Sequence, residues 1–313
     1  MKTIIGLDIG GTKTAIVEGT ADAQILKRQE IPTNGQKPFN QTFPRIAALV
    51  ADRIAEAKND GRQVTAISVS VGGPLKIAEG VLVTPPHLAG WHGVGLKERL
   101  DKRFPALPVY VEHDGNAGAL AEFHFGVGRE DPGLKHLVFL TLGTGLGAGL
   151  IINGQVVRGA TDTAGEVGHL RLADHGPVGH GKPGSWEGFC SGAGMIQLAK
   201  EMFPATWNGE KTIHDLIQAV LLNDAEALQV VETAGSWLGR GMAVLIDILN
   251  PQIIVLGSLA VVLGERLLEP ARRTLIEEAL PSASDSCRII PSTFGKCTQA
   301  HRVANELPRA SER

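Results

Sequence analysis

Two glycine-rich strings, each placed directly after an apolar run, constrain the fold of this chain most. The first is Asp8-Ile9-Gly10-Gly11-Thr12-Lys13-Thr14, and the second is Gly143-Thr144-Gly145-Leu146-Gly147-Ala148-Gly149. Apolar residues follow each string as well, and glycine allows a chain to turn tightly and to approach a ligand closely. Each string therefore predicts a strand, a turn and a second strand.

The two strings occupy matching places in an internal repeat. Asp8–Thr12 aligns with Thr141–Gly145, an offset of 133 residues from position 8 to position 141. A duplicated lobe implies two similar α/β units with a cleft between the copies. Strands are expected at 3–9, 14–18, 25–31, 64–71, 137–142, 150–152 and 253–256, and helices at 44–58, 192–202, 211–221 and 224–249.

Composition excludes several classes of protein. The chain has 313 residues, 43% of them hydrophobic and 20% charged, and a net charge of -3, so it lacks the basic excess of a nucleic-acid binder. Its N-terminus has only a short apolar run, which is neither a signal peptide nor a membrane span. Cys190, Cys287 and Cys297 form no CxxC pair, which favours a reducing compartment. We expect a cytoplasmic protein with a small substrate.

Neither string alone identifies a phosphate site. The first differs from a P-loop because Thr12 separates Gly11 from Lys13 and because a strand follows. The second matches a dinucleotide-binding fingerprint, but that fingerprint requires a helix where Gly149–Ile152 indicates another strand. An ordinary glycine-rich hairpin remains the alternative for each string taken by itself.

Taken together, the two strings resemble the paired phosphate loops of the actin/hexokinase/chaperone ATPases. The resemblance is closest to the ROK family of repressors, open-reading-frame proteins and sugar kinases, and it extends over nearly the whole chain. It implies an α/β fold with two duplicated ribonuclease-H-like lobes around a central cleft, and ATP, Mg²⁺ and a sugar as ligands. Besides the strings, the segments that carry it are Gly72–Leu75, Pro85–Trp91, Glu112–Glu122, Gly165–His169 and Asn250–Gly257.

Asp114 is the candidate catalytic base. It follows the apolar run Val109–Val111 and precedes a helix-like segment, so we expect its carboxylate at the end of a strand. A helix N-cap is an alternative role that does not exclude catalysis. Similar kinases have a sugar-binding asparagine where this chain has His113, whose neutral ring offers one donor and one acceptor. Asn116 matches a second asparagine of the motif and is either a ligand or a polar residue at a helix start.

The resemblance implies further sugar contacts from Gly73, from Glu166 and His169 in Gly-Glu-Val-Gly-His, and from Glu187. Glu187 ends a loop that binds zinc in the family through three cysteines. Here Val178, His180 and Ser185 stand at the thiolate positions, so we expect no structural zinc. The alternatives for the histidines are solvated side chains or a different zinc site. That site would use His169, His175, His180 and Cys190.

The phosphate strings are expected to bind ATP, with polyphosphate as an alternative donor. Asp8 would hold Mg²⁺ through water. Gly235, Gly239 and Gly241 either contact adenosine or pack helices, and the family usually has glycine where this chain has Ser258. The expected ATP and phosphate contacts are Asp8, Gly10, Gly11, Thr12, Lys13, Gly143, Thr144, Gly145 and Gly257.

The function that these residues predict is an ATP-dependent kinase for a hexose or an N-acylhexosamine, acting on the 6-hydroxyl. The alternative is a weak or inactive sugar sensor of the same family. Repression is not expected, because the chain begins at the first phosphate strand and is not basic. We expect a homodimer without nucleic-acid or membrane partners. The lobes are predicted at 1–118 and 119–296, with a C-terminal helix at about 297–313 completing the first.

Overall fold

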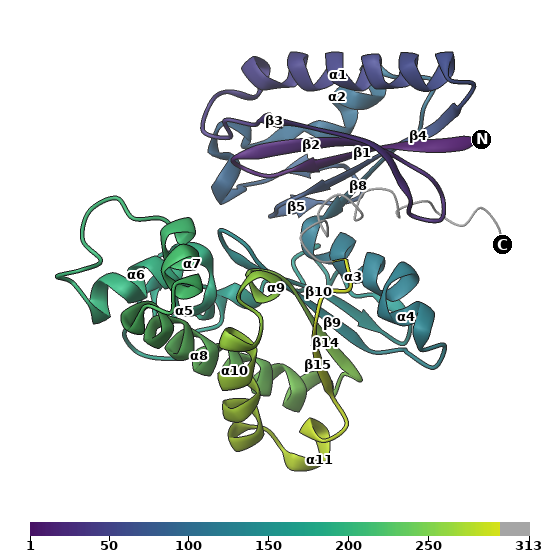
Figure 1. Cartoon of the computed structure of the whole chain (residues 1–313). Coiled ribbons are helices and arrows are strands. Elements are labelled where there is room, and N and C mark those ends of the chain that lie inside the picture. Colours follow the sequence, from purple (N-terminus) through teal and green to yellow (C-terminus); the bar gives the residue numbers. More distant parts are fainter. Residues whose placement is uncertain (295–313) are drawn as a thin grey trace. The chain divides into compact units, whose positions relative to one another are not determined.

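The computed structural model describes residues 1–294, which form two compact units (Figure 1). The first unit comprises Met1–Pro132 and Val156–Ala164. The second comprises Gly133–Gln155 and 165–294. The chain therefore passes from the second unit to the first for the nine residues 156–164, and it then returns to the second unit. The helix expected at about 297–313 lies outside the described residues.

The first unit is built on a five-stranded sheet of order β3-β2-β1-β4-β8. β1 is antiparallel to β2, which is antiparallel to β3, while β4 is parallel to both β1 and β8. Helix α1 covers one face with Ile46 and Val50 (Figure 1). These elements are β1 (Lys2–Ile9), β2 (Lys13–Gly19), β3 (Ile25–Pro32), α1 (Phe39–Asn59), β4 (Gln63–Val71) and β8 (Val109–His113).

The second unit repeats this sheet with the order β11-β10-β9-β14-β15. β10 is antiparallel to β9, and β14 is parallel to both β9 and β15. Asp8 pairs with Ser70 on β4, and Thr141 pairs with Gly257 on β14, so the duplication predicted at an offset of 133 is confirmed. The strands are β9 (Leu137–Leu142), β10 (Leu146–Ile152), β11 (Gln155–Val156), β14 (Ile253–Ser258) and β15 (Arg288–Pro291).

Smaller elements complete the first unit around the buried Trp91, which contacts Phe39 edge to face. A three-stranded sheet and a 3-10 helix follow β4, and they were not expected from the apolar spacing. The elements are β5 (Leu75–Lys76), β6 (Val81–Leu82), η1 (Pro86–Trp91), β7 (Val94–Gly95), α2 (Leu96–Arg103), α3 (Asp114–Phe125) and α4 (Val127–Glu130).

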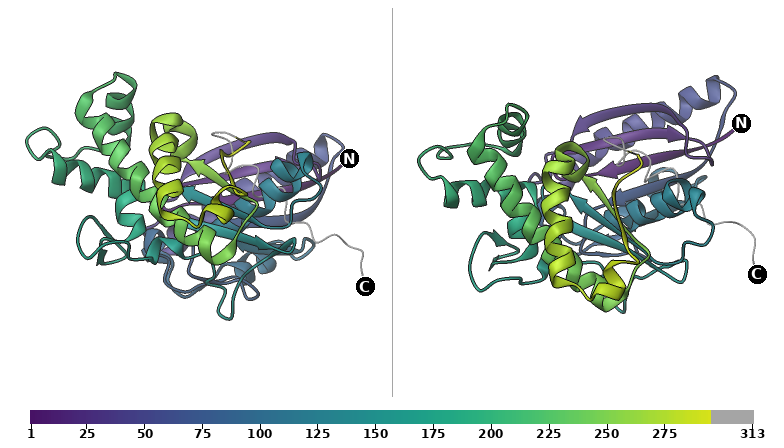
Figure 2. Two further views of the ribbon diagram at one scale, coloured as in Figure 1. Left: turned by 90° about the horizontal axis from the view of Figure 1, so that it is seen from below. Right: turned by 60° about the horizontal axis from the view of Figure 1, so that its bottom comes forward.

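The remaining helices belong to the second unit, where α8 and α10 lie side by side (Figures 1 and 2). Their close approach requires glycine on α8, because a Cβ at Gly235 would meet Pro270 and one at Gly239 would meet the Ala271 carbonyl. The elements are η2 (Val167–His169), β12 (Val178–Gly179), β13 (Lys182–Pro183), α5 (Trp186–Cys190), α6 (Gly192–Met202), α7 (Ile213–Leu221), α8 (Ala225–Leu249), α9 (Leu259–Leu263), α10 (Glu265–Glu278) and α11 (Pro281–Ser284).

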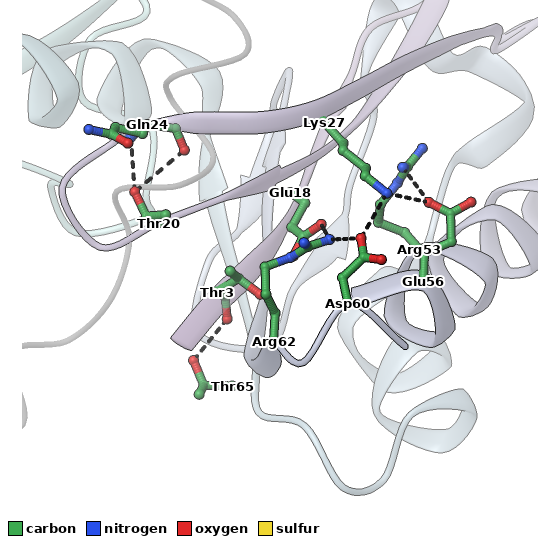
Figure 3. Close-up of polar contacts among 10 residues, drawn as sticks. All are labelled: Thr3, Glu18, Thr20, Gln24, Lys27, Arg53, Glu56, Asp60, Arg62 and Thr65. Carbon is green, nitrogen blue, oxygen red and sulfur yellow. Dashed lines mark hydrogen bonds and ion pairs between the residues drawn. The ribbon is translucent and has the colours of Figure 1, made fainter. Parts of the chain in front are cut away.

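A buried carboxylate on β2 is compensated at the edge of the first unit. Glu18 has no exposed surface, and Arg62 donates to both of its oxygens at 2.7 and 3.1 Å (Figure 3). Arg62 also reaches Asp60, which pairs with Lys27. Removing one partner of a buried ion pair costs about 3 to 5 kcal/mol, so the loss of Arg62 is expected to destabilise this unit.

None of the helices within residues 1–294 combines the length and the apolar composition needed to cross a lipid bilayer.

Candidate active site

Asp114 lies where β8 ends and α3 begins. Its side chain keeps 34% of its surface exposed, so the carboxylate is open to an incoming group. The N-cap of α3 is His113, whose Nδ1 accepts from the Gly115 amide at 3.3 Å. The capping role considered for Asp114 therefore belongs to its neighbour, and the Asp114 carboxylate is not committed to the cap.

His113 is buried beside the glycine pair that follows β4. A Cβ at Gly73 would lie 2.7 Å from Cδ2 of His113, so the ring occupies the space that glycine leaves. Nδ1 accepts from Gly115, and it therefore carries no proton when the imidazole is neutral. The ring proton is then on Nε2, which can donate. An asparagine at this position would offer a donor and an acceptor from one planar group.

Asn116 is buried on the first turn of α3. Its Nδ2 donates to Glu112 Oε1 at 2.9 Å, while its Oδ1 has no hydrogen-bond partner within the described part of the chain. Glu112 and its partner Arg158 were not among the expected site residues. A glutamate in the apolar strand 109–113 was a signal, since a buried carboxylate requires a partner, but no spacing pointed to Arg158.

The first glycine turn joins β1 to β2. The Gly10 amide closes the turn on the Lys13 carbonyl at 3.0 Å, and a Cβ at Gly11 would lie 2.3 Å from the His87 carbonyl oxygen. Lys13 is exposed and pairs with Glu30 at 3.0 Å, a hydrogen bond that lowers the pKa of Glu30. Thr12 is exposed, and Asp8 is half-buried at the end of β1. The turn thus presents an ammonium, a hydroxyl and a carboxylate at one end of the sheet.

The second glycine turn joins β9 to β10 and carries no charge. Its Gly143 amide closes on the Gly145 carbonyl at 2.9 Å, and Thr144 is exposed. A Cβ at Gly143 would meet nothing within 4 Å, so space is open beside the backbone. At Gly257 a Cβ would lie 2.8 Å from the Phe139 ring, and packing explains that glycine.

Glu187 links this second turn to the loop that follows β11. Its Oε2 accepts from the Leu146 amide at 2.9 Å and lies 3.1 Å from Nε2 of His180. The His180 ring stacks on His169 with centroids 3.6 Å apart, and Lys182 Nζ donates to the His169 carbonyl at 3.3 Å. Glu166 lies half-buried directly before η2. Glu187, His180 and His169 are thus brought into one cluster of the second unit.

The protonation of His169 follows from this environment. Burial lowers its pKa below the ordinary value of 6.5, and the neighbouring His180 lowers it further, against the opposing effect of Glu166. The imidazole is therefore neutral near pH 7. A neutral ring can accept one hydrogen bond and donate another, which suits a sugar hydroxyl.

At two of the three loop positions where the resemblance implies zinc-binding cysteines, Val178 and Ser185 make other contacts. Gln197 exchanges two 3.0 Å hydrogen bonds with the backbone of Val178, and the Ser185 hydroxyl caps α5 by accepting from Gly188. Cys190 is fully buried with a raised pKa, and its Sγ donates to the Ala234 carbonyl. Within residues 1–294 no three His, Cys, Asp or Glu side chains gather as metal ligands would.

Known proteins are similar to this chain in sequence along most of its length. The chain is 30% identical over 303 residues to the glucokinase of Halalkalibacterium halodurans, covering 93% of this chain and 90% of that protein. It is 27% identical to the xylose repressor of Bacillus spizizenii over 93% of this chain and 73% of the repressor.

Its structure resembles that of a ROK family glucokinase from Streptomyces griseus in complex with glucose and AMPPNP. The TM-score is 0.79 with 28% identity, over 96% of this chain and 98% of that one. The α/β fold predicted from the repeat is that of this kinase structure. The model of the ROK family matches residues 4–300, and the chain therefore belongs to the ROK family.

Proposed function

We propose that this protein is an ATP-dependent sugar kinase that phosphorylates the 6-hydroxyl of a hexose or an N-acylhexosamine. The observation that carries the proposal is the half-exposed Asp114 carboxylate at the end of β8, in a chain related to glucokinases along nearly its whole length. A carboxylate that is free of the helix cap can accept the proton of a sugar hydroxyl as the hydroxyl attacks phosphorus.

The remaining groups have roles that match their chemistry. Asn116 Oδ1 is an acceptor for a hydroxyl, and Glu166, His169 and Glu187 supply further acceptors and a donor. His113 Nε2 and the backbone of Gly73 complete the sugar contacts. These residues bind and orient the sugar, and Asp114 removes the proton.

ATP supplies the phosphoryl group, and Mg²⁺ would neutralise charge on the phosphates. The residues of the two turns fit phosphates. Thr12, Lys13 and Thr144 are exposed donors, and the backbone beside Gly143 has open space. Asp8 is the carboxylate that would hold a hydrated Mg²⁺.

A sugar sensor is the second candidate, and it is favoured by the repressors among the relatives together with His113 in place of an asparagine. A sensor would bind sugar without transferring phosphate. The two candidates therefore differ in one measurable step.

The decisive experiment measures ADP release by the purified protein with each of a panel of hexoses and N-acylhexosamines. We expect release that depends on both sugar and Mg²⁺, and mass spectrometry of a monophosphorylated sugar as the product. Polyphosphate in place of ATP tests the donor. Sugar binding by calorimetry without ADP release from any sugar would reject the kinase and favour the sensor.

A further inference from the structure

The carboxylate of Glu112 is buried directly beside the proposed base. Only 3% of its side chain is exposed. Oε1 accepts from the His113 amide at 3.0 Å and from Asn116 Nδ2 at 2.9 Å, and Oε2 accepts from Nε and Nη2 of Arg158. One side chain thus contacts the residue before Asp114 and the residue two positions after it.

Arg158 reaches Glu112 from the segment 156–164, which belongs to the first unit although the residues on both sides of it belong to the second. Two further hydrogen bonds fix this segment. Asp162 Oδ2 accepts from the Ile77 amide at 2.9 Å, and the Ala164 amide closes the turn on the Arg158 carbonyl at 3.0 Å. The guanidinium is therefore held in place by backbone that is itself anchored.

The same contacts determine how the Asn116 amide is oriented. A carboxylate only accepts hydrogen bonds, so the amide must direct Nδ2 to Glu112 and Oδ1 away from it. Oδ1 belongs to a side chain that is 99% buried, and it has no hydrogen-bond partner among the described residues. The acceptor is thereby fixed in one orientation, and no described residue uses it as a hydrogen-bond acceptor.

We propose that Glu112 and Arg158 are positioning residues for phosphoryl transfer, an inference that rests on the proposed function. Arg158 holds the Glu112 carboxylate in place. Glu112 in turn fixes the backbone at His113, which precedes the base, and the Asn116 amide, whose Oδ1 accepts from a sugar hydroxyl. Neither side chain is assigned a contact with the sugar.

The test compares two arginines that compensate buried glutamates in the same unit. Arg158→Met removes the partner of Glu112, and the control Arg62→Met removes the partner of Glu18 on the far side of β1 from β8. We expect Arg158→Met to lower kcat/KM for the sugar by about 10- to 100-fold and to change the KM for ATP less than about twofold, because misplaced reacting groups carry that cost. Arg62→Met should lower Tm while the folded protein keeps its kcat/KM within about twofold.

The double variant Arg158→Met/Glu112→Gln keeps the test valid if the single variant does not fold. It removes both charges and keeps an amide oxygen that can accept from Asn116. We therefore expect kcat/KM to recover part of the loss seen in Arg158→Met, or in Glu112→Ala if Arg158→Met is insoluble. No recovery, or equal losses of kcat/KM in Arg158→Met and Arg62→Met, would overturn the positioning role.

Sugar affinity measured by calorimetry separates this inference from the proposed function. A native protein that binds sugar but releases no ADP rejects the kinase and with it the positioning of the base. The positioning of Asn116 for sugar binding then stands if Arg158→Met weakens sugar binding about tenfold or more while Arg62→Met does not. A native protein that binds no sugar at all overturns both.

Discussion

The turn between β1 and β2 and the turn between β9 and β10 occupy the same place in two sheets of the same strand order. In both, the first glycine amide closes the hairpin, at 3.0 Å for Gly10 and 2.9 Å for Gly143. Their surroundings differ. A Cβ at Gly11 would lie 2.3 Å from the His87 carbonyl oxygen, whereas Thr144, which matches Gly11 at the offset of 133, carries a side chain and is exposed.

The two turns also differ in the charged residues beside them. The first turn is flanked by Asp8 and Lys13, and the first unit also carries Asp114 at the end of its fifth strand. The second turn has no charged residue, and its equivalent fifth strand ends at Pro291. Duplication kept the backbone frame because strand pairing sets it, and the side chains diverged. We therefore expect the reacting charges in the first unit and mainly binding groups in the second.

The strongest test of this division is Asp114→Asn. The amide cannot accept the proton of the sugar hydroxyl, so we expect kcat to fall by roughly 10²–10⁴-fold with sugar affinity nearly unchanged. Asp101→Asn, at a partly exposed position of α2 in the same unit, is the matched control and should keep its activity. Turnover of Asp114→Asn close to the native rate would show that Asp114 is not the catalytic base.

Replacing His113 tests whether the first unit also determines which sugar is bound. Asparagine is a good N-cap and can accept from the Gly115 amide as the imidazole does, so His113→Asn should fold. One hydrogen bond to a sugar hydroxyl is worth about 1–3 kcal/mol. The ratio of kcat/KM for glucose-type sugars to kcat/KM for the native substrate should therefore be roughly 5- to 150-fold higher in His113→Asn than in the native protein. Identical rankings of a sugar panel by both proteins would show that His113 does not select the substrate.

The space beside each turn can be tested by adding one methyl group at Gly11 and one at Gly143, which occupy different places in the repeat. Gly11→Ala forces the His87 backbone to move and should cost about 1–3 kcal/mol of unfolding free energy, measured by urea denaturation. Gly143→Ala should leave stability within about 0.5 kcal/mol. If a phosphate of ATP approaches the backbone at Gly143, the KM of Gly143→Ala for ATP should rise by about tenfold, because the methyl group displaces the phosphate. Unchanged kinetics of Gly143→Ala would mean that no ligand approaches this backbone.

The sheets were predictable because apolar runs and glycine turns determine them locally. The strand predicted at 137–142 is β9 (Leu137–Leu142), and the helix predicted at 192–202 is α6 (Gly192–Met202). The helix predicted to begin at Pro44 is α1, which begins at Phe39 and contains Pro44 in its interior. Apolar spacing did not predict the two-residue strands β5 to β7, which are too short to show a period.

Within the candidate site, residues with a motif were predictable and their partners were not. The position of Asp114 at the end of a strand followed from the apolar run before it. The Arg158–Glu112 contact joins residues that no local pattern relates, and the segment 156–164 joins the first unit only through tertiary contacts. His180 lies in the loop that Glu187 ends, but the motif did not predict their contact. The capping role of His113 was missed because histidine is an uncommon N-cap.

The smallest expected effect concerns the second unit, whose binding histidine should be neutral. Burial, and then His180, lower the pKa of His169 below 6.5, while Glu166 and Glu187 oppose them and Lys182 adds to them. Sugar affinity should therefore stay constant from pH 8 to about 6.5 and fall by less than about fourfold at pH 6.0, because a group with an ordinary pKa of 6.5 would lose that much of its neutral form.

The unfolding free energy changes with pH in the same direction as the sugar affinity. Between the lowered pKa and 6.5 the unfolded chain binds more protons than the folded one, so the unfolding free energy falls as pH falls through this window and is fully present above it. His169→Gln should abolish this component of the pH dependence of sugar affinity, measured by calorimetry. His180→Gln should move the inflection to higher pH, because the second cause of the lowered pKa is removed. A native affinity that already declines between pH 8 and 7, in a manner that His169→Gln abolishes, would show that His169 is protonated there and would contradict the neutral binding group assigned to the second unit.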